Sequence, residues 1–571
     1  MKRLLKYLKK YTKESVFAPL FKLFEAALEL IVPLVIAAII DRGIGEGDTG
    51  YVTLMSAVLV LLGLLGLGFS VFAQYCAAKA SVGFITSMKS DLFSHIQTLS
   101  YGDIDNLGTS TMITRMTADS NKLQTGLNLA LRLLSRSPVV VFGAMIMAFT
   151  IDSYAGSVFA VAIPLLSIVV FGIMGITMPM YKRVQGGLDK ILTKTRENLR
   201  GVRVIRAFGK EEREAEQFRN ENYLLTVAQK RAGHISALMN PLTYVIINLA
   251  IIVLIDVGAI RVNGGDLTQG EVIALYNYMS QILIELIKLA NLIITISKAL
   301  ASASRIASVL DITPTQSYGT DSAIGEGDVA VEFKGVSLNY HGGEDSLTDI
   351  SFTAMRGETI GIIGGTGSGK SSLVNLIPRF YDATRGEVKL FGKDVKEYTK
   401  EAITGCVGIV PQTAVLFFGT VRDNMLWGNP NASEEQMLSA IKCAEALDFI
   451  TDKGGLMAEC QAGGKNFSGG QRQRLTIARA LVKDPDILIL DDSASALDFA
   501  TDARLRSSIK AISKNKTVFI VSQRAASVMF ADKILVMDDG RCVSSGTHEE
   551  LIKDSPVYKE IYESQFKKEA L

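Results

Sequence analysis

The sequence predicts a helical bundle that crosses a membrane six times and continues as long cytoplasmic helices, followed by a soluble α/β domain. Three observations predict this arrangement. Apolar stretches of the ~20-residue length needed to cross a bilayer recur through the first part of the 571-residue chain. A phosphate-binding loop motif stands at residues 364–371, and an apolar run at 487–490 ends in two aspartates. A chain of this length accommodates more than one domain with a substantial core.

The ends of the predicted membrane spans are defined to within several residues. They cover roughly residues 16–40, 52–77, 129–152, 157–181, 237–262 and 271–300. The segments between the second and third spans and between the fourth and fifth are long, and the other three are short. Apolar residues in the long segments recur at helical spacing, which predicts that the spans continue as helices beyond the membrane.

The charges of the connecting segments orient the bundle. The 41–51 segment is acidic, whereas the 181–236 segment is rich in lysine and arginine. Basic segments stay on the cytoplasmic side of a membrane. We therefore expect a multi-pass protein of the cytoplasmic membrane, with both termini and the α/β domain in the cytoplasm.

The basic N-terminus before the first span has two interpretations. A signal peptide is one of them. The spacing of Leu4, Leu5 and Leu8 instead favours a short amphipathic helix that lies on the cytoplasmic face of the membrane. No small-residue cleavage site follows a compact apolar core, so we favour a retained helix.

Several charged residues fall inside the apolar stretches, where an ionisable group is costly and usually faces a cavity or a partner. They are Lys22, Glu25, Glu29, Asp256, Glu285 and Lys288. Glu285 and Lys288 stand three residues apart on one helix face, so they either pair with each other or line a cavity. The membrane part thus indicates transport through a helix bundle and leaves the substrate open.

Composition bounds the remaining function classes. A net charge of +2 argues against nucleic-acid binding, which usually shows a concentrated basic surface. The five cysteines form no pair with metal-ligand spacing, and reduced thiols in a cytosolic setting are the expected state.

Pro314, Gly319 and Gly325 mark a linker. We place the membrane domain at 1–305, the linker at 306–328 and the α/β domain at 329–571.

The motif GGTGSGKS at 364–371 fits the P-loop template at every fixed position. It follows an apolar run at 360–363 and precedes an apolar helical segment at 371–377, which is the context that the motif requires. Its glycines let successive backbone N–H groups point at phosphate oxygens. Lys370 is expected to contact the β- and γ-phosphates of ATP, and the Ser371 hydroxyl is expected to bind Mg²⁺.

Together with FSGGQ at 467–471 and the aspartates Asp491 and Asp492, the P-loop resembles the nucleotide-binding cassette of ABC transporters. The resemblance implies that Tyr340 stacks on adenine, that Gln412 is the Q-loop glutamine, and that the FSGGQ turn closes over ATP bound to a second cassette. It also implies that 495–498 is a loop communicating between the two ATP sites. The residues expected to contact the nucleotide are Tyr340, Gly364, Thr366, Gly367, Ser368, Gly369, Lys370, Ser371, Ser372, Gln412, Ser468, Gly469, Gly470, Gln471 and Asp491. The residues expected around Mg²⁺ are Ser371, Gln412 and Asp491.

The order of spans, linker and cassette resembles the exporter type of ABC transporter over essentially the whole chain. In that type each long cytoplasmic hairpin ends in a short coupling helix that contacts a cassette. The resemblance places these coupling regions near 101–106 and 202–212.

The residues expected to act in catalysis are Asp492, Gln523 and Gln412. The first two of them depart from the family pattern. Asp492 stands where the family usually has a glutamate that polarises water, and Gln523 where it usually has a histidine. Aspartate is one methylene shorter, and glutamine cannot become cationic at neutral pH. Both changes weaken hydrolysis and leave the binding residues intact, as in the degenerate-site subunit of bacterial heterodimeric multidrug-type exporters.

We therefore expect one half of a heterodimer that exports a small molecule, lipid or peptide by alternating access, with most hydrolysis at the site completed by the partner. Two alternatives stay open. The chain could be a slow homodimeric exporter, or an ATP-gated regulator or channel that does not pump.

Overall fold

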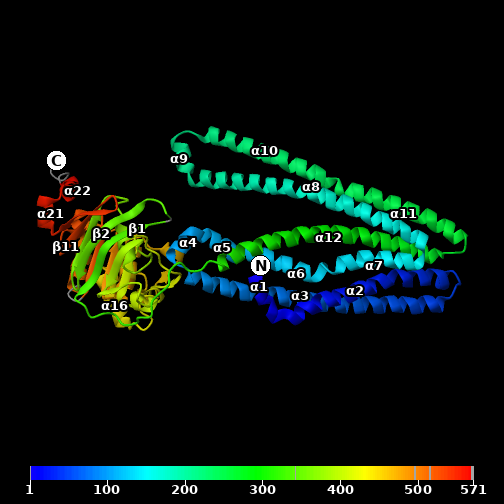
Figure 1. Ribbon diagram of the computed structural model, residues 1–571, viewed down its shortest axis with the longest axis horizontal. Helices are drawn as coiled ribbons and strands as arrows, with labels where there is room; N and C mark the ends of the chain where they lie inside the picture. The colour runs from blue at the N-terminus through cyan, green and yellow to red at the C-terminus, as the bar shows by residue number, and fades with distance from the viewer. Residues whose placement is uncertain (1, 341, 494–496, 513–515, 567–571) are drawn as a thin grey trace. The chain divides into compact units, whose positions relative to one another are not determined.

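The computed structural model describes residues 2–340, 342–493, 497–512 and 516–566. It divides into two compact units (Figure 1). The helical unit comprises Met1–Gln97 and Thr109–Ile312, and the α/β unit comprises Thr98–Gly108 and Thr313–Leu571. The short segment from Thr98 to Gly108 thus belongs to the α/β unit, although it stands between two long helices of the helical unit.

The helical unit consists of long helices that run side by side (Figure 1). Among the described residues, six helical segments are long and apolar enough to cross a membrane. The helices are α1 (Lys2–Leu8), α2 (Thr12–Ala38), α3 (Thr49–Thr98), α5 (Thr109–Thr114), α6 (Ser120–Leu133), α7 (Arg136–Ile151), α8 (Ser153–Arg200), α9 (Val202–Ala207), α10 (Glu211–Ala237), α11 (Met239–Asn263) and α12 (Gln269–Leu310). The predicted long extensions are present, since α8 and α10 continue far beyond the fourth and fifth expected spans and pack against each other (Figure 1).

The third span, expected over 129–152, lies within the helical segment Thr109–Ile151. Its helical hydrogen bonding is interrupted at one point, which the sequence analysis did not anticipate, because α6 ends at Leu133 and α7 begins at Arg136. Pro138 lies in the first turn of α7 and has no N–H to donate to the carbonyl of Leu134. A helix can begin at such a proline but cannot run through it without losing a hydrogen bond. The interruption is therefore confined to the Leu134–Ser135 turn, where both residues keep helical backbone angles.

The α/β unit contains two larger sheets and a short two-stranded one. Its strands are β1 (Val329–Asn339), β2 (Asp345–Met355), β3 (Thr359–Gly364), β4 (Arg385–Leu390), β5 (Lys393–Asp394), β6 (Val407–Val410), β7 (Gly419–Thr420), β8 (Glu459–Cys460), β9 (Ile487–Asp491), β10 (Thr517–Ser522), β11 (Lys533–Asp538) and β12 (Arg541–Gly546). Its helices of four residues or more are α4 (Tyr101–Leu107), α13 (Lys370–Leu376), α14 (Lys400–Cys406), α15 (Val421–Leu426), α16 (Glu434–Cys443), α17 (Leu447–Thr451), α18 (Gly469–Val482), α19 (Phe499–Ile512), α20 (Ala525–Val528), α21 (His548–Asp554) and α22 (Pro556–Phe566).

The six-stranded sheet has the order β12-β11-β3-β10-β9-β6. Strands β11, β3, β10, β9 and β6 are parallel, and only the edge strand β12 runs antiparallel. Every residue of β3, β9 and β10 is buried, as expected for parallel strands covered on both faces. The other main sheet, β2-β1-β4-β5, is antiparallel and shares a core with the first through Phe333, Phe352 and Phe519. The expected fold class is confirmed: a six-span helical domain is followed by an α/β domain.

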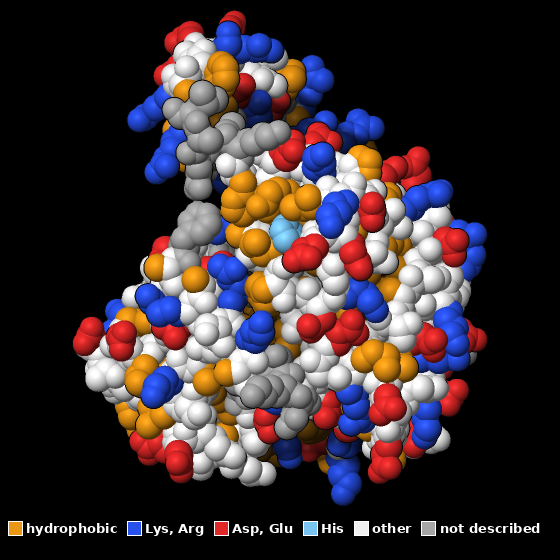
Figure 2. Space-filling model, turned by 90° about the vertical axis from the view of Figure 1, so that its left-hand side faces the viewer, with side chains coloured by type: hydrophobic (Ala, Val, Ile, Leu, Met, Phe, Trp, Pro, Cys, Tyr) orange, Lys and Arg blue, Asp and Glu red, His pale blue; other side chains and the backbone are white. Residues whose placement is uncertain are grey.

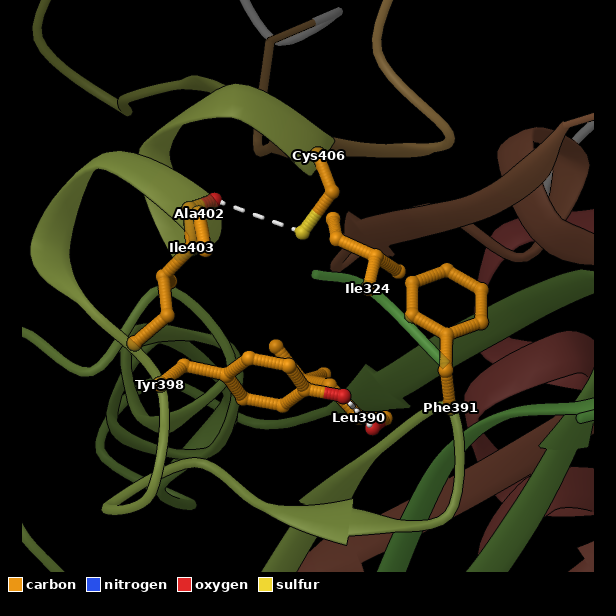
Figure 3. A pocket seen from close by; sticks show the side chains of 7 residues that line it. All are labelled: Ile324, Leu390, Phe391, Tyr398, Ala402, Ile403 and Cys406. Carbon is orange, nitrogen blue, oxygen red and sulfur yellow. Dashed lines mark hydrogen bonds between the residues drawn. The ribbon is translucent and has the colours of Figure 1, made fainter. Parts of the chain in front are cut away.

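The segment after the last span packs onto the α/β unit. Helix α12 continues to Leu310, beyond the expected start of the linker at 306. Ile324 then lines a small apolar pocket with Phe391, Tyr398 and Cys406, which leaves no room for a water molecule (Figure 3). Burial raises the pKa of the Cys406 thiol to about 12, so this cysteine is an inert core residue.

The surface of the α/β unit is mixed in charge. On the face in Figure 2, lysine and arginine side chains lie among aspartate and glutamate side chains, with small apolar patches between them. A mixed surface of this kind is typical of soluble domains.

Candidate nucleotide-binding site

Four neighbouring parallel strands bring the predicted motifs to one edge of the six-stranded sheet. The P-loop follows β3, Gln523 follows β10, Asp492 follows β9 and Gln412 follows β6. Because these strands are parallel and adjacent, their carboxyl ends meet at the same edge, where open α/β sheets bind ligands.

The P-loop has the backbone conformation that its glycines permit. Gly367 and Gly369 have φ values of 83° and 91°, in the left-handed region that disfavours other residues. A Cβ at Gly369 would also come within 2.8 Å of the Ser346 carbonyl oxygen. A Cβ at Gly365 or Gly367 would meet nothing within 4 Å, so the concave side of the loop leaves room for phosphate groups. The loop therefore fits the phosphates of ATP.

Lys370 lies inside this loop. Its ammonium donates to the carbonyl oxygen of Gly364 at 3.0 Å and to the hydroxyl of Ser368 at 3.3 Å. Burial lowers the pKa of Lys370, and the nearby carboxylates of Asp492 and Asp491 oppose that shift. The ammonium is thus held at the centre of the loop, where the resemblance expects the β- and γ-phosphates.

Ser371 and Asp491 form the candidate magnesium site. The Ser371 hydroxyl donates to a carboxylate oxygen of Asp491 at 3.0 Å. Burial raises the pKa of Asp491, while the hydrogen bond from Ser371 and the charge of Lys370 oppose the shift. A hydroxyl and a carboxylate are hard oxygen donors, which Mg²⁺ prefers, so the pair fits this ion. Gln412, the third expected ligand, is exposed in the loop after β6 and makes no hydrogen bond with another described residue.

Asp492 follows the last residue of β9 and has a φ of 46°. Aspartate tolerates this left-handed conformation better than most residues. The backbone N–H of Asp492 donates to the carbonyl oxygen of Val521 in β10 at 3.0 Å. This bond fixes the origin of the short side chain, so its carboxylate cannot advance by a simple shift of the main chain.

Gln523 is exposed after β10, and its side-chain oxygen lies 3.5 Å from the Thr366 hydroxyl of the P-loop. Its backbone is held by the last described helix. The Gln565 amide on α22 donates to the carbonyl oxygen of Gln523 at 2.8 Å and accepts from the N–H of Ala525 at 2.8 Å. The sequence analysis missed Gln565, since a lone glutamine far from every motif carries no signal.

The FSGGQ turn forms the start of α18 with Ser468 as its N-cap. The Ser468 hydroxyl accepts from the N–H of Gln471 at 3.3 Å, and the Gln471 side chain accepts from the N–H of Ser468 at 3.0 Å. Ser468 and Gly469 are exposed and Gly470 is half-buried. Within the described residues, Ser468 forms no hydrogen bond to the P-loop of its own chain. The turn is thus an outward-facing helix N-terminus of the kind that binds phosphate.

Tyr340 contacts the P-loop helix and an aromatic neighbour. Its hydroxyl lies near the side chain of Ser372, the residue after Ser371. Its ring meets the ring of Tyr381 edge-on, with centroids 4.9 Å apart. Burial raises the pKa of Tyr340. One face of this half-buried ring is the expected platform for adenine.

Tyr381 connects this platform to α4. Its hydroxyl donates to the carboxylate of Asp105 at 2.6 Å, and Tyr101 of α4 stacks on Phe380 with ring centroids 4.3 Å apart. The region expected near 101–106 is therefore a helix that contacts the α/β unit a few side chains away from the P-loop. Asp105 falls within the expected coupling region 101–106, whereas no motif in the sequence marked Tyr381.

The N-terminus of α4 is also tied to the segment after α12. Asp103 forms a capping box with Ser100, and its carboxylate accepts from the backbone N–H of Thr315 at 3.1 Å. The Ser100 and Thr315 hydroxyls lie 2.8 Å apart. Burial acts to raise the pKa of Asp103, but the hydrogen bonds from Ser100 and Thr315 outweigh it and hold that pKa below its usual value.

Comparison with known proteins identifies the family. Residues 16–286 match the family model of the ABC transporter transmembrane region, and residues 347–495 match that of the ABC transporter. An uncharacterized ABC transporter ATP-binding protein of Mycobacterium tuberculosis is 36% identical over 573 residues, covering 98% of this chain and 97% of the relative. The chain belongs to the ABC transporters.

Further relatives of this ABC transporter cover its whole length. YfiB of Bacillus subtilis, an uncharacterized ABC transporter ATP-binding protein, is 34% identical over 100% of this chain and 99% of its own. An ATP-dependent lipid A-core flippase of Vibrio vulnificus is 28% identical over 99% of this chain and 97% of its own. A bacterial Atm1-family ABC exporter solved with ATP bound has the same fold, with a TM-score of 0.79 at 23% identity, covering 97% of this chain and 98% of that one.

These findings make the protein an ABC exporter half-transporter, with a transmembrane domain fused to an ABC ATPase domain in one multi-pass membrane chain. Family membership supports ATP-driven export. Of the loop expected to communicate between ATP sites, Ser495 and Ala496 lie outside the described residues. Asp498 lies within them and accepts from the N–H of Thr501 at 2.9 Å, at the start of α19.

Proposed function

We propose that this ABC exporter is one half of a heterodimer, and that its own ATP site binds Mg²⁺-ATP and hydrolyses it slowly. The observation that carries the proposal is Asp492, a short carboxylate whose N–H is fixed to Val521 at the end of β9. The chain thus keeps the residues of a binding site and shortens the group that would act on water.

The residues proposed to bind ATP and Mg²⁺ are suitably placed for this role. The curled P-loop presents backbone N–H groups and the Lys370 ammonium to the phosphates, and Tyr340 offers a ring to adenine. Ser371, Asp491 and Gln412 would hold Mg²⁺, which when bound offsets the charge of the β- and γ-phosphates.

The hydrolytic half is impaired at two positions. A carboxylate that orients the attacking water must reach it, and a misplacement of about 1 Å can cost roughly a hundredfold in rate. Gln523 can donate a hydrogen bond to the γ-phosphate but brings no positive charge. Asp492 and Gln523 therefore weaken the same step.

The signature turn favours a partner cassette. Ser468, Gly469 and Gly470 lie at an outward-facing helix N-terminus and are not engaged by the P-loop of their own chain. In our proposal they complete the ATP site of the other half, which supplies a catalytic glutamate and histidine.

Coupling to the membrane domain would use two short helices. The α4 helix is linked to the nucleotide site through Asp105, Tyr381 and Tyr340. The second region, near 202–212, contains α9 and the 72% exposed side chain of Phe208. The α/β unit carries an exposed aromatic patch in which Phe417 stacks on Trp427, with Phe418 beside them in sequence. We propose that this patch receives α9 of the other half.

In this scheme ATP binding clamps the two cassettes together, and the coupling helices turn the bundle outward. Hydrolysis, mainly at the partner's catalytic site, resets it. The cassettes would lie in the cytoplasm, on the side of the basic segments.

The test compares ATP turnover by the full-length chain alone with turnover by the chain co-expressed with a second ABC half-transporter that co-purifies with it. Turnover that needs the partner, and that survives Lys370→Ala better than loss of the partner's catalytic glutamate, supports the proposal. Robust, substrate-stimulated turnover by the chain alone contradicts it.

The slow homodimer remains a second candidate because Asp492 retains a carboxylate. It predicts that the chain alone turns over ATP and that Asp492→Ala abolishes this activity. Uphill transport in vesicles separates either exporter from an ATP-gated channel, which gives only passive flux.

A further inference from the structure

Four charged residues form a continuous chain across three spans of the helical unit. Arg136 at the start of α7 pairs with Glu29 of α2 at 2.5 Å and with Glu285 of α12 at 2.7 Å. Lys288 of α12 pairs with Glu285 at 2.8 Å, which is one of the two alternatives that the sequence left open for these residues. Ser137 also donates to Glu285, at 2.9 Å. The charges therefore alternate in the order Glu29, Arg136, Glu285, Lys288.

The centre and the ends of this chain differ in exposure. The side chains of Arg136 and Glu285 are 9% and 4% exposed, whereas those of Glu29 and Lys288 are 40% and 47% exposed. Arg136 and Glu285 alone would already be a neutral buried pair. Glu29 and Lys288 add two further charges within membrane spans, where each is costly. Neutrality of the core does not account for them.

The two ends have unused hydrogen-bonding capacity. Among the described residues, Glu29 accepts one hydrogen bond and Lys288 donates one. A carboxylate can accept several hydrogen bonds and an ammonium can donate three. The row of four charges thus ends in the Glu29 carboxylate on one side and the Lys288 ammonium on the other, and each can form further hydrogen bonds.

Four buried polar side-chain atoms on α6, α7 and α12 and the turn between α6 and α7 have no hydrogen-bond partner among the described residues. They are the Nε atoms of Arg132 and Arg136, the Oγ of Ser135, and the Oε1 of Gln281, one turn before Glu285 on α12. Buried polar groups in proteins are almost always hydrogen-bonded, and exceptions often mark a site for water or ligand. Three of these four atoms are donors, which favours an acceptor-rich group such as phosphate.

We propose that this chain of charges binds a zwitterionic amphiphile, with the cationic group of the ligand on Glu29 and its phosphate on Lys288. The apolar surface of the spans around the chain would receive the ligand's acyl or alkyl part. The inference rests on the proposed export function and specifies the substrate class, but the binding it describes needs no ATP.

The test is calorimetric titration of the full-length protein in nanodiscs of anionic phosphatidylglycerol, which offer no competing zwitterion. Three short-chain probes share one alkyl tail: hexylphosphocholine, hexyltrimethylammonium and hexyl phosphate. We expect the zwitterion to bind on the order of tenfold more tightly than either probe that carries charge of one sign only, because it engages both Glu29 and Lys288.

The variants separate a binding site from a structural clamp. Glu29→Gln is expected to weaken the phosphocholine and ammonium probes by on the order of tenfold and to spare the phosphate probe. Lys288→Gln is expected to weaken the phosphocholine and phosphate probes and to spare the ammonium probe. Lys298→Gln removes an exposed lysine of the same helix and is expected to change none of the three.

Two results would overturn the proposal. One is equal affinity of the wild type for hexylphosphocholine and for either of the other two probes. The other is a loss in Glu29→Gln or Lys288→Gln that is the same for all three probes and is accompanied by a lower melting temperature, which indicates a clamp. ATP turnover measured on the same samples reports separately on the proposed function, so either can fail without the other.

Discussion

The hydroxyl of Tyr381 donates a 2.6 Å hydrogen bond to the carboxylate of Asp105, while the edge of the Tyr381 ring meets the ring of Tyr340. One side chain thus touches both the helix α4 and the candidate adenine platform. The aromatic contact with Tyr340 does not need the hydroxyl, but the contact with Asp105 does.

Removing only the hydroxyl should therefore separate binding from coupling. Tyr381→Phe is expected to leave ATP affinity within about twofold and to lower the substrate-stimulated part of ATP turnover several-fold, since the lost bond is charge-assisted. Nucleotide binding and transport in vesicles would be measured side by side. Equal loss of affinity and transport would mean that Tyr381 acts on the nucleotide alone.

Lengthening the carboxylate at 492 should restore hydrolysis. Asp492→Glu moves the carboxylate outward by one methylene, and the fixed Asp492 N–H leaves the main chain in place. We expect a rise in ATP turnover of up to about a hundredfold at this site. Asp492→Asn, which keeps the length of the native side chain but removes its charge, is the matched control and should stay at or below the native rate. An unchanged rate in Asp492→Glu would place the limiting defect elsewhere.

Gln565 should act on Gln523 without touching the nucleotide. Gln565→Leu removes both hydrogen bonds to the Gln523–Ala525 backbone. We expect faster hydrogen exchange in 522–526 and little change in ATP affinity. The variant should also reduce the gain in turnover that Gln523→His gives in the Asp492→Glu background. The neighbouring Ser564→Ala change, on the same helix, serves as a control and should leave exchange in 522–526 unaltered.

The hydrogen bonds that Asp103 accepts from Ser100 and Thr315 should make the stability of the protein depend on pH. The folded pKa of Asp103 lies below the usual value for aspartate, so its contribution to stability is complete above the unfolded pKa of about 3.9 and is lost as pH falls through the folded pKa. Asp103→Asn should melt below the wild type at pH 6, and the gap should narrow as the pH falls below about 4. A gap that does not change with pH would show that the charge of Asp103 contributes nothing.

Most of the fold could be predicted from short motifs and from periodic patterns of apolar residues in the sequence. The six spans and their helical extensions follow from apolar length and spacing, because crossing a bilayer requires both. The P-loop was predictable because its function requires glycine at fixed positions, and the strand and helix on either side of Gly369 were readable as apolar runs.

What the sequence left hidden are contacts between residues far apart in the chain. Tyr381 and Asp105, or Arg136 and Glu285, are common residue types whose pairing is set by tertiary packing alone. The interruption before Arg136 was missed for another reason. Proline in the first turn of a helix and proline inside a continuous apolar span give the same hydropathy, so Pro138 did not mark a boundary.

The α/β unit takes part of its structure from a segment that precedes it in the chain by two hundred residues or so, namely Thr98–Gly108. A fragment that begins at Thr313 would keep every ATP-binding motif but lose the stacking partner of Phe380 and the carboxylate that holds the Thr315 N–H. A synthetic peptide of residues 98–108 is the natural complement of such a fragment. Fragment complementation would then measure in solution, without any membrane, how strongly nucleotide changes the affinity of the α/β unit for its α4 helix.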